Sequence, residues 1–116
     1  MIGTGKSQAV EASVNSDYEV LLSPGAMELF FLNGSGTSPN VSSIVVGGIG
    51  PFTYSWVITG DDISIISPLS DNTKFSAGGF YVEYNEVATI TVTDAGNGNA
   101  ETERNINISF EFSNLN

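Results

Sequence analysis

The sequence predicts an all-β protein folded as an antiparallel β-sandwich. Apolar and polar residues alternate along short segments, as they do in strands with one buried and one exposed face. Glycine, proline, asparagine and aspartate punctuate these segments at intervals of roughly ten residues, and helical periodicity is nearly absent. We therefore expect about seven to nine strands. A length of 116 residues is enough for one core and too short for two.

The first expected strands are short apolar runs. They are residues 18–22, 27–32 and 41–46. Ser23-Pro24-Gly25 separates the first two runs as a turn, because proline presets φ and glycine permits a positive φ. Residues 33–40 read as a loop by composition, and the glycine-rich residues 47–51 end the third run.

The most informative segment is residues 52–58. Phe52, Tyr54, Trp56 and Ile58 alternate with smaller residues, so the large rings share one face of a strand. Trp56 is the single tryptophan of the chain and is expected to anchor the core between two sheets.

The C-terminal third predicts a hairpin after three further short strands. Those short strands are expected at residues 63–66, 73–77 and 80–84. In the hairpin, residues 88–93 and 105–112 alternate strictly, and residues 94–99 connect them. The predicted core residues are Trp56, Tyr54, Ile90, Val92, Ile106 and Ile108.

Composition narrows the possible functions. Thirteen acidic residues against three basic ones give a formal charge of -10, which disfavours nucleic acid and anionic membrane surfaces as partners. The absence of cysteine and histidine excludes disulfides, thiolate metal sites and Ser-His-Asp catalysis. We expect no enzymatic activity, no catalytic residues and no cofactor.

Two groups of acidic residues are candidate sites. Asp61, Asp62 and Asp94 lie at strand ends and form a weak calcium candidate, because Ca²⁺ prefers clustered carboxylates. Without a recognisable calcium-binding loop, the favoured interpretation is solvated turn residues and no metal. Glu83 and Glu86 flank an expected bend, and nothing in the sequence places them around a glycosidase cleft.

The strand at residues 27–32 carries apolar residues on both faces. One face would meet the core, and the other would meet another protein chain or be covered by the N-terminal segment. We predict an interface through Met27, Leu29 and Phe31 or their alternates. Residues 1–16 are expected to form a flexible arm and residues 17–116 the sandwich domain.

Two stretches resemble immunoglobulin-like sandwich domains of the PKD or bacterial Ig-like kind. They are GGIGPFTYSWVITGDD at residues 47–62 and VATITVTDAGNGNAETERNINISF at residues 87–110. The first resembles the strands around the Tyr-x-Trp of PKD repeats, and the second resembles their last hairpin. The resemblance implies that Trp56 is the core tryptophan of the third strand and that Asp94 begins the last loop.

The resemblance also implies a setting. Such domains occur on tailed-phage virions and on bacterial surface proteins. Residues 1–8 contain no apolar segment of the length that a secretory signal needs, which predicts a protein that stays in the cytoplasm, where phages assemble. We therefore expect a non-enzymatic virion decoration protein with capsid or tail proteins as partners, as a possible homo-oligomer, with weak contacts to host-surface glycans. The alternative is one repeat of a bacterial cell-surface adhesin or secreted hydrolase.

Overall fold

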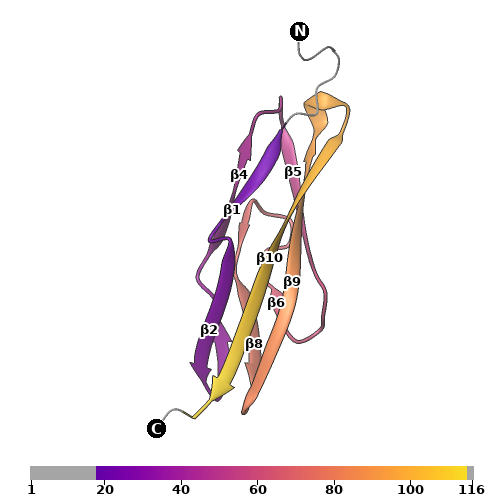
Figure 1. The fold of residues 1–116 in the computed structure, drawn as a ribbon. Helices are drawn as coiled ribbons and strands as arrows, with labels where there is room; N and C mark the ends of the chain where they lie inside the picture. Colours follow the sequence, from indigo (N-terminus) through magenta and orange to yellow (C-terminus); the bar gives the residue numbers. More distant parts are fainter. Residues whose placement is uncertain (1–17, 115–116) are drawn as a thin grey trace.

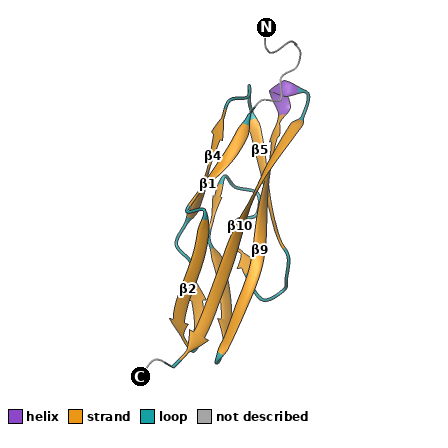
Figure 2. Cartoon of the chain, viewed as in Figure 1, coloured by secondary structure: helices purple, strands orange, loops and turns teal. Residues whose placement is uncertain are grey.

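The computed structural model describes residues 18–114 as an elongated β-sandwich of 62 × 23 × 19 Å (Figure 1). The strands are β1 (Glu19–Ser23), β2 (Ala26–Leu32), β3 (Gly34–Thr37), β4 (Val41–Val46), β5 (Phe52–Ile58), β6 (Ser64–Ile65), β7 (Asn72–Thr73), β8 (Phe75–Gly79), β9 (Val82–Asp94) and β10 (Ala100–Ser113). A single 3-10 turn, η1 (Ala95–Asn97), joins the last two strands (Figure 2). No helix in residues 18–114 is long and apolar enough to cross a membrane.

One layer of the sandwich is a four-stranded sheet in the order β2-β10-β9-β5. The other consists of two three-stranded sheets, β1-β4-β7 and β3-β8-β6. These two short sheets follow one another along the long axis, because β3 leads into β4 and β7 leads into β8 (Figure 1). Ser38 closes the join between them: its N–H donates to the Phe75 carbonyl (2.7 Å), and its hydroxyl accepts from the Phe75 N–H (2.9 Å).

The N-terminal strands change layers. β1 pairs antiparallel with β4, whereas β2, after the Ser23-Pro24-Gly25 turn, pairs parallel with β10 in the opposite layer. The predicted turn is therefore present, but it moves the chain from one sheet to the other instead of closing a hairpin. Ser23–Pro24 is a cis peptide bond, as is Gly50–Pro51.

The predicted C-terminal hairpin is confirmed and is longer than expected. β9 and β10 pair antiparallel from Val82↔Phe112 to Asp94↔Ala100. The bend expected at Glu83 and Glu86 is wrong, because both residues lie within one continuous strand, β9, which begins at Val82. Residues 83–86 still alternate between outward and inward positions, and each of them pairs with a residue of β10. This backbone pairing keeps the polar segment in the strand.

The loop expected at residues 33–40 contains β3, which the composition hid. Gly34–Thr37 pairs antiparallel with β8 through its backbone, and glycine supplies no side-chain alternation to predict it. Gly36 is needed there for a close approach. A Cβ at this position would lie 2.4 Å from Cδ1 of Phe31, whose ring fills the space between β2 and β3.

The predicted core is confirmed at nearly every residue. Trp56, Ile90, Val92, Ile106 and Ile108 are buried, while Tyr54 is partly buried and packs against the same cluster. Trp56 packs edge-on against Phe75 of the opposite layer, with ring centroids 5.9 Å apart. Its indole N–H donates to the Ser70 carbonyl at 2.8 Å. Burial of each such side chain stabilises the folded state by about 1.5–3 kcal/mol. The buried residues come from both layers, so one core runs between them.

Candidate interaction surface

The three residues predicted to form an interface face inward. Met27 is only 8% exposed and belongs to the core, and Leu29 and Phe31 pack against it. Phe31 stacks on both Phe110 and Phe112, at centroid distances of 5.4 and 5.6 Å. The prediction that these three residues form the interface is therefore wrong, because their side chains belong to the core beneath β2.

The alternate residues of the same strand are the exposed ones. Phe30 is 64% exposed and Leu32 is 62% exposed, on the outer face of the four-stranded sheet. Glu28 is the residue in the sequence that indicates the outward face, because Phe30 and Leu32 follow it at even spacing along the strand. A charged residue marks the face away from the core, and Phe30 and Leu32 share that face.

Within residues 18–114, the free side of β2 is an open strand edge. β2 pairs with β10 on one side, and no hydrogen bond or ion pair from residues 18–114 reaches its other side. The opposite edge of the sheet, at β5, is covered by a loop. There the main-chain N–H of Trp56 donates to the Pro68 carbonyl at 2.8 Å. An uncovered edge offers main-chain donors and acceptors for pairing with another chain.

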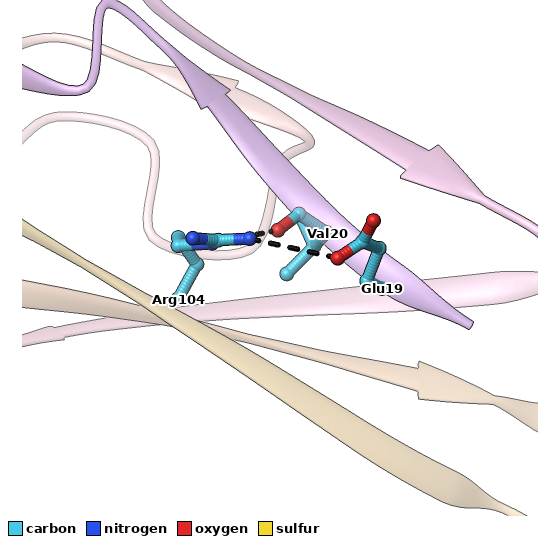
Figure 3. A network of polar contacts seen from close by, with 3 residues as sticks. All are labelled: Glu19, Val20 and Arg104. Carbon is cyan, nitrogen blue, oxygen red and sulfur yellow. Dashed lines mark hydrogen bonds and ion pairs between the residues drawn. The ribbon is translucent and has the colours of Figure 1, made fainter. Parts of the chain in front are cut away.

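The edge of the other layer at β1 is also covered. Figure 3 shows Arg104 of β10 reaching across to β1, where its Nε donates to the Val20 carbonyl at 3.0 Å. Its Nη2 lies 3.7 Å from Oε1 of Glu19, and both side chains are about half exposed. That ion pair is worth little by itself, but the bond to Val20 occupies a main-chain acceptor at the edge.

Carboxylates surround the exposed apolar residues of β2. The register places Phe30 beside Glu111 of β10, and Glu111 beside Glu83 of β9. In the neighbouring row Glu28 lies beside Ser109, whose hydroxyl donates to Oε2 of Glu83 at 3.1 Å. This group, which we call the β2 surface, consists of Glu28, Phe30, Leu32, Glu83 and Glu111.

Two shallow depressions hollow the face that carries the β2 surface. One, of about 510 Å³, is bordered by outward residues of β2, β9 and β10 that include Glu28, Asn85 and Asn107. The other, of about 300 Å³, lies where β9 and β10 meet the Phe80-Tyr81 turn and is lined by Tyr81, Glu83 and Glu111. The face therefore has a concave relief beside the edge of β2.

A second exposed apolar group lies on the outer face of the other layer. Leu21 of β1 is paired with Ile44 of β4, and Val46 is the next outward residue of the same strand. On the β1 side of this group, the Val20 carbonyl already accepts a hydrogen bond from Arg104, whereas no such bond from residues 18–114 reaches the free side of β2.

The weak calcium candidate is contradicted by the positions of its residues. Asp94 pairs with Phe52 at the start of β5, whereas Asp61 and Asp62 follow the end of that strand. No group of three or more metal-ligating side chains occurs in the described part of the chain. The three carboxylates therefore do not share one site.

Asp94 instead holds the loop that precedes β5. Its side chain is fully buried, and its two oxygens accept hydrogen bonds from the N–H groups of Ile49 and Gly50, both at 2.8 Å. Gly48 has φ +82, and a Cβ there would lie 2.8 Å from Oδ2 of Asp94. The glycine-rich loop thus wraps closely around a buried carboxylate, which sequence analysis had placed only at the start of a loop.

Tyr18 closes the same end of the sandwich. Its hydroxyl lies within hydrogen-bonding reach of the Val92 carbonyl, at 3.0 Å, and of the Ala100 carbonyl, donating to one at a time. Burial raises the pKa of Tyr18 above its ordinary value of 10.0, and the charges of Asp94 and Glu101 raise it further. Tyr18 thereby ties the start of β1 to the β9–β10 hairpin.

Glu86 and Glu83 lie on opposite faces of β9, so they cannot act as a facing pair. Glu86 points inward and is 8% exposed; its Oε2 accepts from the Asp62 N–H at 3.2 Å, while Oε1 is buried without a partner. The arm expected at residues 1–16 lies outside the described residues.

Comparison with known proteins identifies the fold. No family model matches the chain, and no curated protein matches it. Among solved structures, the ASH / PapD-like domain of human CEP192 (PapD-like domain 7) is similar with a TM-score of 0.64, covering 100% of this chain and 99% of that chain at 7% identity. At this identity the likeness concerns the fold alone: the chain is an all-β, immunoglobulin-like sandwich.

Proposed function

We propose that this protein is a non-enzymatic structural protein, an Ig-like accessory or decoration protein of a tailed-phage virion, whose partners are capsid or tail proteins. The observation that carries the proposal is the β2 surface, where Phe30 and Leu32 are exposed beside an open strand edge. Apolar side chains grouped at an unpaired edge are a feature of protein–protein contact sites. The virion setting rests on the resemblance of residues 47–62 and 87–110 to PKD-like domains.

The remaining outer face suits a role at a particle surface. Outward positions of β5, β9 and β10 carry threonine, serine and asparagine, including Thr53, Thr89 and Asn105. Thr89 donates to the Asn105 side-chain oxygen at 2.8 Å across neighbouring strands. Such a face is well hydrated, and its hydroxyl and amide groups match the chemistry of weak glycan contacts.

One observation favours the alternative, a repeat of a bacterial surface adhesin or secreted hydrolase. The described chain starts at Tyr18 and finishes at Asn114, at opposite ends of the 62 Å axis (Figure 1). Ends on opposite sides would allow neighbouring domains to follow one another in a row. The β2 surface lies near the C-terminal end and would then contact the next domain.

Mass spectrometry of purified native phage particles and of host cells tests these two functions. A virion protein is recovered with the particles as a separate polypeptide in a constant ratio to the major capsid or tail protein. Recovery only as part of a longer processed surface polypeptide would reject the virion proposal and support the repeat.

A further inference from the structure

The backbone of β2 is prepared for the addition of one more strand. Its seven residues, Ala26–Leu32, pair with β10 along the whole length, and alternate N–H and C=O groups point to the free side. On the free side of β5 the main-chain N–H of Trp56 donates to the Pro68 carbonyl, and on the free side of β1 the Val20 carbonyl accepts from Arg104. No such bond from residues 18–114 reaches the free side of β2. The edge therefore has main-chain donors and acceptors that no group in residues 18–114 uses, along the seven residues of the strand.

The side chains around this edge select the chemistry of an added strand. Phe30 and Leu32 offer apolar contact, while Glu28, Glu83 and Glu111 supply three carboxylates on the same face. No lysine or arginine occurs in residues 26–36, 76–86 or 107–114, which form this end of the sandwich. Lysine or arginine stems would lie along Phe30 while their charged ends reach the carboxylates.

The same charges act against a second copy of this chain. Two β2 edges brought together would place Glu28 of each copy close to carboxylates of the other, in a chain of net charge -10. Like charges at an edge oppose self-pairing and leave pairing with a cationic strand favourable. Charge complementarity thus points away from a homodimer and towards a different, basic partner.

We propose that the β2 edge binds an extended segment of a partner protein in which apolar residues alternate with lysine or arginine. The segment pairs with the backbone of β2. Its lysine or arginine residues share the outer face, where their aliphatic stems cover Phe30 and Leu32 and their charged ends reach Glu28 and Glu111, in the field of Glu83. Its apolar residues point to the inner face, alongside Met27, Leu29 and Phe31. This rests on the proposed function as an attached accessory protein, and it names the attachment site and the chemistry of the partner.

The first test uses the full chain, labelled with ¹⁵N, and two synthetic peptides. Both have the length of β2, seven residues; one alternates lysine with valine and the other glutamate with valine. We expect the lysine peptide to bind at least about tenfold more tightly at low salt, with less difference at high salt. Addition of the lysine peptide should change the backbone amide chemical shifts along β2. Equal binding of both peptides, no binding of the lysine peptide, or shifts confined to β5 would overturn the proposal.

Variants at exposed residues sharpen the test. Phe30→Ser combined with Leu32→Ser should weaken lysine-peptide binding about tenfold or more, and Glu111→Lys should reverse the preference between the peptides. The matched control is Val57→Ser, which is 59% exposed on the opposite edge strand of the same sheet and should leave binding unchanged. If the control weakens binding equally, the site is not at β2.

The outcome separates this inference from the proposed function. If the protein is found on particles and the Phe30→Ser, Leu32→Ser variant is incorporated normally, the inference fails while the function stands. If the peptide binds as expected and no particle carries the protein, the function fails and the surface stands. A third outcome is that the protein forms a dimer, that the double variant dissociates it, and that the lysine peptide does not bind. This result would show that a second copy occupies the β2 edge, and it would overturn the inference.

Discussion

Replacing Asp94 by asparagine tests whether a buried carboxylate holds the loop before β5. The substitution preserves shape but puts an amide NH₂ where one oxygen now accepts from the N–H of Ile49 or Gly50, each at 2.8 Å. One charge-assisted bond worth about 1.5–3 kcal/mol is lost, and the other becomes an ordinary bond worth about 1 kcal/mol. We expect the free energy of unfolding to fall by about 2–4 kcal/mol.

Urea unfolding followed by Trp56 fluorescence measures this change. The single tryptophan lies in the core on β5, so its emission reports on the global transition. For a domain of this size, the expected loss corresponds to a decrease in Tm of roughly 8–16 °C. The matched control is Asp61→Asn, at an exposed turn position, which should change the stability by less than about 0.5 kcal/mol.

A loss below about 1 kcal/mol for Asp94→Asn would refute the reasoning, provided that the denaturant m-value is unchanged. Such a result would mean that water or loop rearrangement satisfies the N–H groups of Ile49 and Gly50 at no cost. A loss equal to that of Asp61→Asn would lead to the same conclusion, because it would reduce Asp94 to an ordinary turn aspartate.

Three further changes are predicted. Trp56→Ala should lower the free energy of unfolding by about 3–5 kcal/mol in thermal unfolding followed by circular dichroism, because it opens a cavity against Phe75; a near-neutral result would contradict its central place in the core. The raised pKa of Tyr18 means that its contribution to stability is complete below pH 10.0 and is lost as the pH rises through the folded-state pKa. Unfolding measured on both sides of that pH should show a smaller alkaline loss in Tyr18→Phe than in the parent, and equal losses would argue against the assignment. Glu86→Gln should raise the free energy of unfolding in urea by about 1 kcal/mol, since it removes a buried charge whose Oε1 has no partner; a decrease of that size would indicate that the charge is compensated.

Alternation along the chain was enough to predict the sandwich and most of its core. Residues 52–58 and 105–112 each place large apolar side chains at every second position, and burial of one face then follows from the pleat. The pattern failed where side chains carry no alternation. β3 consists of glycine, serine and threonine, and it is a strand because its backbone pairs with β8.

The features that define the site depend on contacts between distant parts of the chain. Asp94 meets Ile49 and Gly50 because β5 and β9 pair with Phe52 opposite Asp94, a register that no local pattern specifies. The two apolar faces of residues 27–32 did predict that apolar side chains of this strand lie both in the core and on the surface. Glu28 carried the information needed to choose the face, since its carboxylate has no place under β2 among the rings of the core.

The edge strands β5, β1 and β2 differ in what opposes pairing with another chain. Pro68 occupies the edge of β5 and Arg104 the edge of β1, so pairing there would first require breaking a hydrogen bond within the chain. β2 relies on the negative charges of Glu28 and its neighbours, and a charge excludes only partners of the same sign. Protection of this kind prevents self-association of an acidic protein and leaves the edge open to a basic strand. On our proposal, an edge protected by charge therefore disfavours pairing with a second copy and favours pairing with a cationic strand.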